Sequence, residues 1–127
     1  MEKRFRLKKN GAFTYVYRRG KNASSRDLVM LYAKNKGIKV GFSVSKKVGN
    51  AVTRNLVKRR LRECFRPHLG GIKTGLYVIV ARPSAAQATF QSLFRQVQDL
   101  LKKQHAFRED AGQSAPASGS EKGNRAT

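Results

Sequence analysis

The segment from residue 39 to residue 66 constrains the fold most, because a strand pattern is followed there directly by a helix pattern. Large apolar residues alternate with small or polar ones, a period of two that predicts a strand over residues 39–45 with one apolar face. Asn50 is a favourable N-cap, and neither Pro nor Gly follows it until Pro67. The second part of the segment is therefore predicted to be a helix over residues 50–66.

The predicted helix has one apolar face and one strongly basic face. At about 100° per residue, Val57, Leu61 and Cys64 fall together on the side that is expected to face a core. The opposite arc holds Arg54, Asn55, Lys58, Arg59, Arg62 and Arg66. A solvated face usually mixes charge signs, but only Glu63 offsets these cations. Their mutual repulsion indicates a polyanionic partner, for which a nucleic-acid phosphate backbone is the natural candidate.

The net charge of +21 lies entirely within the first 107 residues, because the three basic and three acidic side chains of residues 108–127 cancel. A basic domain with a pI near 11.2 indicates a nucleic-acid partner far more often than a membrane. Residues 108–127 are rich in Gly, Ser, Ala and Pro and show no periodicity. We therefore expect one RNA-binding domain over residues 1–107, followed by a disordered tail.

The other periodic stretches predict two helices and two strands. They are a helix from Asn10 to Gly20, strands over residues 28–33 and 76–81, and a helix from about Thr89 to Ala106. The short link after the strand at 28–33 predicts an antiparallel hairpin with the strand at 39–45, and residues 21–25 are expected to form a loop. The order α-β-β-α-β-α predicts an α/β (α+β) two-layer sandwich. General rules make the βαβ crossover of residues 39–81 right-handed.

The first helix carries Tyr15, Tyr17 and Arg18 within four residues. Phe13 and Tyr17 fit two interpretations. They dock the helix on the sheet, or they form a stacking surface for unpaired bases, since aromatic rings beside cations are the usual platform for single strands.

Cys64 has no second cysteine to pair with in the chain, which favours a buried, inert thiol. The basic amino terminus is not followed by an apolar stretch, and the apolar run at residues 76–81 is too short to span a bilayer. We therefore expect a cytoplasmic protein without a membrane partner.

Catalytic groups are scarce in the chain. The acids of residues 1–107 are Glu2, Asp27, Glu63 and Asp99, and they are scattered over different predicted elements. His68 and His105 lie beyond helix ends and not at metal-ligand spacing. A protein-only nuclease would need metal-binding carboxylates or an acid and a base close together, so we expect no catalytic side chain and no protein-bound metal. The turn at residues 46–50 still directs backbone N–H groups towards solvent, as suits a phosphate.

The run FSVSKKVGNAVTRNLVKRRLRE, followed by Cys64 and Phe65, closely resembles the signature of the bacterial ribonuclease P protein subunit. Further matches are RLKKNGAF at 6–13, RRG at 18–20, Arg26, and VIVARP at 78–83. The resemblance implies that the protein is the partner of a large catalytic RNA and binds the 5′ leader of precursor tRNA. The RNA, with Mg²⁺ that it mainly holds itself, hydrolyses the precursor and removes this leader. The resemblance implies no small-molecule substrate. The resemblance also implies a left-handed βαβ crossover in place of the right-handed one.

Carried over by position, the resemblance implies two RNA-contacting sites. The leader-binding cleft would be lined by Phe13, Tyr17, Val29, Leu31 and Ser43, and Val29 and Leu31 share one strand face. Leu31 stands where relatives often carry an aromatic residue, so apolar contact replaces stacking there. The basic helix motif would be Lys46, Lys47, Arg54, Asn55, Lys58, Arg59 and Arg62, with Arg18, Arg26 and Arg66 as further basic contacts.

Two other classes of function compete with a ribozyme subunit. A ribosomal or RNA-chaperone protein would share the charge and the fold, and a protein-only nuclease would cleave without added RNA. The scarcity of acids argues against the nuclease.

Overall fold

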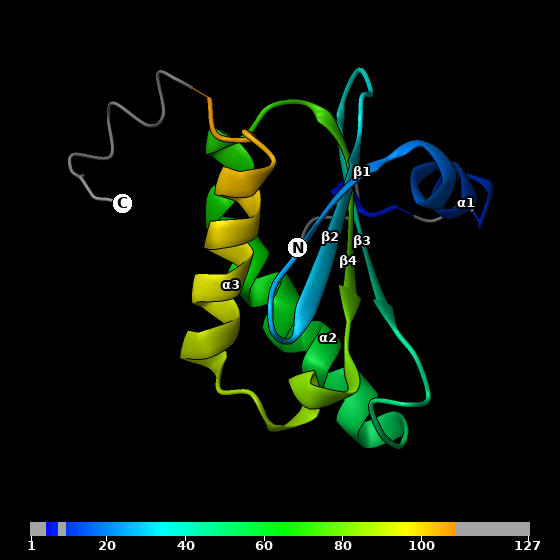
Figure 1. Cartoon of the computed structure of the whole chain (residues 1–127), viewed down its shortest axis with the longest axis vertical. Coiled ribbons are helices and arrows are strands. Elements are labelled where there is room, and N and C mark those ends of the chain that lie inside the picture. Colours follow the sequence, from blue (N-terminus) through cyan, green and yellow to red (C-terminus); the bar gives the residue numbers. More distant parts are fainter. Residues whose placement is uncertain (1–4, 8–9, 109–127) are drawn as a thin grey trace.

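The structure, a computed structural model, describes residues 5–7 and 10–108. Its elements are α1 (Asn10–Arg19), β1 (Lys21–Ser24), β2 (Leu28–Ala33), β3 (Ile38–Val44), α2 (Ala51–Phe65), η2 (Arg66–Gly71), β4 (Gly75–Ala81), η3 (Pro83–Gln87) and α3 (Phe90–Lys103), where η denotes a 3-10 helix. Leaving these short 3-10 helices aside, the order is α-β-β-β-α-β-α (Figure 1). Apart from Arg108, the predicted tail lies outside the described residues.

The four strands form one mixed sheet in the order β1-β2-β4-β3. β4 is antiparallel to β2 and parallel to β3. The hairpin predicted between the strands at residues 28–33 and 39–45, which are β2 and β3, is therefore wrong. The physical reason is the apolar character of β4, which is buried over residues 75–79 and takes the central position between the two strands. The short link at residues 34–37 instead leads from one strand to another that lies beyond β4.

The predicted loop at residues 21–25 is also corrected, because β1 is a strand that pairs antiparallel with β2. Lys21, Asn22 and Ser24 are exposed, and only Ala23 is half-buried. A polar edge strand of this kind has no apolar alternation from which it could be predicted.

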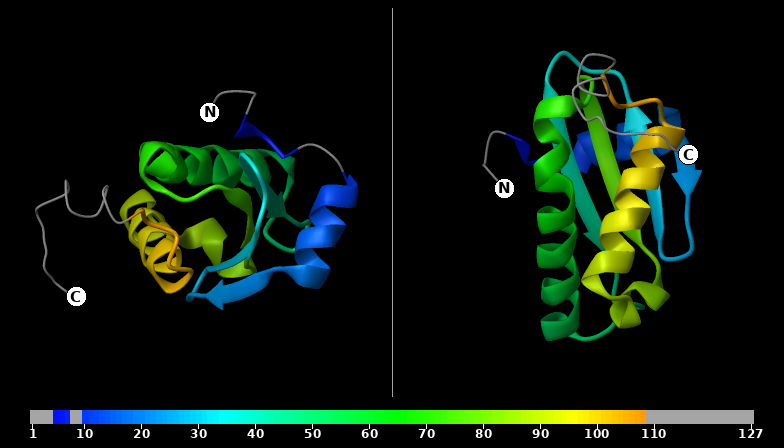
Figure 2. Two further views of the ribbon diagram at one scale, coloured as in Figure 1. Left: turned by 90° about the horizontal axis from the view of Figure 1, so that it is seen from above. Right: turned by 90° about the vertical axis from the view of Figure 1, so that its left-hand side faces the viewer.

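Helices cover both faces of the sheet (Figure 2). α2 and α3 pack on one face, whereas α1 crosses part of the other, so the two-layer description omits the α1 side. Side chains of β4 alternate between the two sides: Tyr77 and Ile79 enter the larger core, and Val78 enters the smaller one. The smaller core consists of Val16, Leu31, Ala33, Leu76 and Val78.

The two long helices begin where they were predicted to begin, and Asn50 is the predicted N-cap. Asn50 Oδ1 accepts a hydrogen bond from the Thr53 backbone N–H at 3.0 Å, and Thr89 Oγ1 accepts one from the Ser92 N–H at 3.1 Å. The predicted apolar face of α2 is confirmed, since Val57, Leu61, Cys64 and Phe65 are buried. Burial, with a smaller effect of the Glu63 charge, raises the pKa of the Cys64 thiol to about 11. The thiol is therefore protonated at neutral pH, as the interpretation of an inert residue requires.

Arg108 belongs to the folded part and not to the predicted tail. Its backbone N–H donates to the Gly71 carbonyl at 2.9 Å, and its guanidinium contacts the Gly70 carbonyl. Among the helices of residues 5–7 and 10–108, none is long and apolar enough to cross a membrane.

Asp27 is a buried acid that joins three elements. Its carboxylate accepts hydrogen bonds from Ser84 Oγ at 2.6 Å and Gln96 Nε2 at 2.7 Å. Its backbone N–H donates to Gln96 Oε1 at 2.9 Å. The Arg26 Nε atom lies 3.5 Å from the same carboxylate, while most of the Arg26 side chain is exposed. The network therefore fixes the start of β2 against η3 and α3, at the end of the sheet from which Arg26 projects.

The same contacts set the protonation of Asp27. Burial alone would raise the pKa of this carboxyl, but hydrogen bonds from Ser84 and Gln96 and the charge of Arg26 outweigh it, so the pKa lies below 3.8. Since the pKa is lower in the folded chain than in the unfolded one, Asp27 stabilises the fold above that pH. The contribution is lost as the pH falls below 3.8.

We predict that Asp27→Ala lowers the free energy of unfolding at neutral pH by about 2 kcal/mol, because the hydrogen bonds from Ser84 Oγ and Gln96 Nε2 to the buried carboxylate are lost. Urea unfolding followed by circular dichroism measures the loss. The gap between wild type and variant should narrow as the pH is lowered below 3.8, because the carboxyl of the unfolded chain takes up its proton before that of the folded chain. Asp99→Ala, an exposed change on α3, is the control, and an equal loss in both variants would contradict the role of the network.

Candidate nucleic-acid interface

The face of the sheet beneath α1 includes two neighbouring rows of residues that run across β2, β4 and β3. Strand pairing aligns Leu31 with Val78 and Val78 with Gly41, and all three are buried. The next row, which we call the open row, consists of Val29, Val80 and Ser43. Each residue of the open row is half-buried. The open row is therefore the part of this face that a ligand chain could touch.

Phe13 lies over the buried row because Gly41 has no side chain. A Cβ atom at Gly41 would lie 2.5 Å from Phe13 Cζ, closer than carbon atoms approach each other. The ring packs on the smaller core and is half-buried. Tyr17, one helical turn later, has 48% of its surface exposed. Of the two interpretations of these aromatics, docking on the sheet describes Phe13 and an accessible ring describes Tyr17.

The predicted cleft residues of the sheet share this face, but they differ in exposure. Val29 and Ser43 stand in one row, on either side of Val80. Leu31 is only 7% exposed and belongs to the smaller core, so it supports Phe13 more than it offers a surface to a ligand.

Exposed cations surround the end of the sheet next to the open row. β2 begins at this end, and β3 and β4 finish there, because Leu28 and Val44 both align with Ala81. The cations precede or follow these strands: Arg26, Lys46, Lys47 and Arg82. Backbone turns hold the two lysines, since the Val48 N–H donates to the Ser45 carbonyl at 3.0 Å. The arrangement offers charges for the phosphates of a chain that lies on the open row.

The predicted basic face of α2 is largely turned to solvent. Asn55, Arg59 and Arg66 are exposed, and Arg54, Lys58 and Arg62 are half-buried. Arg66 is partly neutralised, because its Nη2 lies 2.6 Å from Glu63 Oε1. Arg60 points elsewhere, and its Nη1 donates to the Ala88 carbonyl at 3.3 Å. The two basic groups, one on α2 and one at the end of the sheet, meet at Lys46 and Lys47, which precede the helix.

Two predicted basic contacts lie apart from the open row. Arg18 is exposed on the outer side of α1, where it lines a surface hollow away from the open row. Arg66 stands at the far end of α2. The structure therefore does not gather all predicted cations into one site.

The described residues contain no group of three His, Cys, Asp or Glu side chains that could hold a metal ion. Asp27 is hydrogen-bonded within the fold, and Glu63 pairs with Arg66. His68 stacks on Phe94 with ring centroids 5.5 Å apart, and burial lowers the pKa of its imidazole. These groups have structural partners, so the donor set does not fit a Mg²⁺ site made by this part of the chain alone.

Comparisons with known proteins decide the family. A family model described as ribonuclease P matches residues 1–105. The chain is 40% identical over 110 residues to the ribonuclease P protein component of Staphylococcus carnosus, which covers 84% of this chain and 96% of that relative. The chain belongs to the ribonuclease P protein family. Its function is that of a protein subunit of the endoribonuclease ribonuclease P, in tRNA 5′ processing.

Solved structures of ribonuclease P proteins share the fold. A mutant Staphylococcus aureus RNase P protein gives a TM-score of 0.79 at 36% identity, covering 84% of this chain and 93% of that one. A second S. aureus RNase P protein structure gives 0.77 at 34% identity, covering 82% and 98%. The mixed four-stranded sheet is therefore the arrangement of this ribonuclease P family.

Sequence reasoning missed three residues of this candidate interface. Val80 fills the middle of the open row, but the wrongly predicted hairpin placed no strand between Val29 and Ser43. Gly41 lies under Phe13, and its place in a strand was a signal of a close approach. Arg82 directly follows the apolar run at residues 76–81, a position that marks it as a cation at a strand end.

We predict that Gly41→Ala lowers the free energy of unfolding of this ribonuclease P protein by about 1 to 3 kcal/mol, because the added methyl group collides with the Phe13 ring. Urea denaturation measures the loss. In a Phe13→Ala background the same methyl group should cost much less, since the ring it meets is gone.

Gly37→Ala is the matched control for this cycle, because a Cβ there meets no atom within 4 Å. If Gly41→Ala is as harmless as Gly37→Ala, Phe13 does not depend on the glycine. An unchanged cost in the Phe13→Ala background would assign the strain to another neighbour, of which Leu7 is the nearest at 3.2 Å.

Proposed function

We propose that the chain binds the catalytic RNA of ribonuclease P through the basic face of α2, and the 5′ leader of precursor tRNA through the open row beside α1. The observation that carries the proposal is the open row itself, a half-buried strip between an exposed tyrosine and exposed cations. A single strand needs a floor for its bases and charges for its phosphates, and both occur here.

The composition of the open row suits an unpaired strand of varied sequence. Val29 and Val80 offer apolar contact to any base, and Ser43 adds a hydroxyl that donates or accepts. Tyr17 stands beside the row with half of its surface free for stacking. Such contacts bind an unpaired strand with little preference for its sequence. This suits leaders whose sequences differ among tRNA precursors.

The basic face of α2 suits a structured RNA. Its exposed and half-buried cations follow one side of a fifteen-residue helix, with Asn55 as a hydrogen-bonding group among them. Cations spaced along a rigid helix hold a phosphate backbone in a fixed position, which is the role of contacts that do not read sequence. We propose Lys46, Lys47, Arg54, Asn55, Lys58, Arg59 and Arg62 as these contacts.

We propose that the RNA subunit performs the hydrolysis and holds most of the Mg²⁺, while the protein positions the substrate. This division of labour agrees with the donor set of the described residues, in which Asp27 and Glu63 have partners within the fold. The proposed place of action is the cytoplasm, and an unpaired, buried Cys64 suits a reducing compartment.

We infer that the βαβ crossover from β3 through α2 to β4 is left-handed, as the family resemblance implies. The view from the helical side in Figure 2 (right) supports this, since β3 and β4 both run downwards there and β3 lies to the left. A right-handed crossover between the same two strands would place α2 on the face of the sheet that carries α1 and the open row. The left-handed connection leaves that face free for a strand of RNA.

We predict that Tyr17→Ala weakens the affinity of the reconstituted holoenzyme for precursor tRNA by about 1 to 3 kcal/mol if a base stacks on the ring. Mature tRNA, which lacks the leader, should bind wild type and variant alike. Fluorescence anisotropy with both RNAs measures the difference. Phe90→Ala removes a similarly exposed ring on the opposite face and is the control. Equal losses for precursor and mature tRNA would refute the leader site.

We predict that Arg59→Ala or Lys58→Ala weakens binding to the catalytic RNA in a salt-dependent way. Each lost phosphate contact should reduce the slope of log affinity against log salt by about one unit. Arg95→Ala, an exposed arginine on α3, should leave the slope unchanged. The proposal for α2 fails if all three variants show the wild-type slope. Reconstituted cleavage of precursor tRNA then separates a ribozyme subunit from a general RNA chaperone, which would not support cleavage.

A further inference from the structure

Tyr15 is an exposed aromatic residue that the proposed leader and α2 surfaces do not use. It stands two positions from both Phe13 and Tyr17, which is about 200° around the helix, so it points away from the open row. Half of its surface is exposed. Its ring is as exposed as that of Tyr17, which the proposed leader surface uses.

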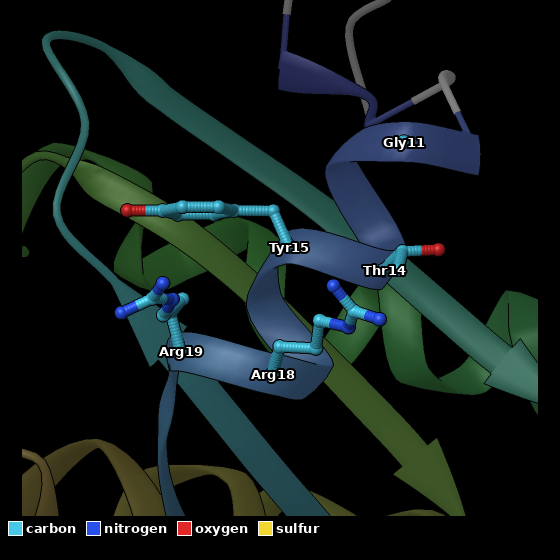
Figure 3. A pocket seen from close by; sticks show the side chains of 5 residues that line it. All are labelled: Gly11, Thr14, Tyr15, Arg18 and Arg19. Atoms are coloured by element: carbon cyan, nitrogen blue, oxygen red, sulfur yellow. The ribbon is translucent and has the colours of Figure 1, made fainter.

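Two surface hollows meet at Tyr15. One, of about 420 Å³, lies on the outer side of α1 and is lined by Gly11, Thr14, Tyr15, Arg18 and Arg19. Figure 3 shows Tyr15 and Arg19 on one side of this helix, one turn apart, with Thr14 and Arg18 on the neighbouring side. The other, of about 270 Å³, is lined by Tyr15, Arg19, Lys21, Tyr32, Ala33, Lys34 and Lys73. We call the second one the Tyr15 hollow.

Cations line the Tyr15 hollow, and no acid does. Arg19, Lys21 and Lys34 are exposed and come from three different segments: the end of α1, the start of β1 and the turn after β2. The acids of the described residues lie elsewhere, with Asp27 at the opposite end of β2 and the others on α2 and α3. Because nothing neutralises this group, it attracts an anion.

The floor of the hollow is rigid. The Tyr32 hydroxyl donates to the Thr74 carbonyl at 2.6 Å, and Lys73 Nζ lies 4.5 Å from the centre of the Tyr32 ring. Lys73 Nζ also donates to the Gln104 carbonyl at 3.3 Å. Tyr32 and Lys73 are therefore held by the fold, whereas the Tyr15 ring has no hydrogen bond or ring contact within the described part of the chain and is available to a ligand.

We propose that the Tyr15 hollow binds one unpaired RNA nucleotide, with its base stacked on Tyr15 and its phosphate held by Arg19 and Lys34. The inference rests on the proposed function and extends it to a second nucleotide site on the far side of α1. An aromatic ring beside uncompensated cations matches both parts of a nucleotide. A hollow near the lower limit of ordinary ligand pockets, about 300 Å³, suits one nucleotide and not a duplex.

The nucleotide comes from one of two sources, which share this chemistry. A leader that is long enough could continue from the open row around the end of α1. An unpaired nucleotide of the catalytic RNA could enter the hollow directly. The experiment below distinguishes the two.

The test uses the full chain reconstituted with the catalytic RNA. Tyr15→Ala should weaken binding at least about fivefold, as loss of one stacked base does, whereas Tyr15→Phe should bind like wild type. Arg19→Ala or Lys34→Ala should reduce the salt slope by about one unit. Affinity is measured for the catalytic RNA alone, and then for precursor tRNAs with a short leader and with a long one. Phe90→Ala is the control for loss of an exposed ring.

A loss confined to long leaders identifies the leader as the source, and an equal loss for the catalytic RNA alone identifies that RNA. Either result supports the hollow. The inference is overturned if Tyr15→Ala matches Phe90→Ala in every assay, or if Tyr15→Phe loses as much as Tyr15→Ala. Tyr17→Ala distinguishes failure of this inference from failure of the proposed function. If Tyr17→Ala loses affinity for the leader and Tyr15→Ala does not, the inference fails and the proposed function still stands. If wild type itself does not favour precursor over mature tRNA, the proposed function fails instead.

Discussion

Burial of β4 on both of its faces is the constraint on which the rest of the structure depends. One face gives Tyr77 and Ile79 to the core beneath α2 and α3, and the other gives Val78 to the core beneath α1. A strand that is apolar on both sides is stable only in the middle of a covered sheet. Its central position separates β2 from β3, and it thereby places Val80 between Val29 and Ser43. The proposed leader surface is thus a consequence of how the core is filled.

Asp27 and Glu63 have partners within the fold and leave the proposed RNA-binding surfaces basic. Asp27 is enclosed by Ser84 and Gln96 and stabilises the sheet end from which Arg26 projects. Glu63 pairs with Arg66 at the last turn of α2, far from the lysines that precede the helix. Lys46, Lys47 and Arg82 at the end of the sheet, and the cations along most of α2, therefore keep their charge free for phosphates. The partnered acids thus act within the fold, whereas the exposed cations determine the charge of the surface.

Local patterns predicted where the two long helices begin, because Asn50 and Thr89 act on their own first turns and need no distant partner. The alternation of β3 also predicted which residues face the larger core. Pairing between strands could not be read in the same way, since the turn at residues 34–37 fits a hairpin equally well. The strand order of the sheet is decided by which strand occupies the central position, and β4 lies there because both of its faces are apolar and buried. Phe13, Tyr17 and the basic helix could be proposed from local patterns and the family resemblance, whereas Val80 and the polar strand β1 depend on strand pairing and could not.

Phe13 and Tyr17 show how one short helix combines a fixed part with an adaptable one. Phe13 is locked over Gly41, so the position of α1 relative to the open row is set before any RNA arrives. Tyr17 and Tyr15 project from that fixed helix in different directions, each with about half of its surface exposed. A preorganised backbone with free rings pays little ordering entropy on binding and still adjusts to different bases. A helix held in this way presents one aromatic surface to each side, and an RNA strand that follows the cations around its end would meet both.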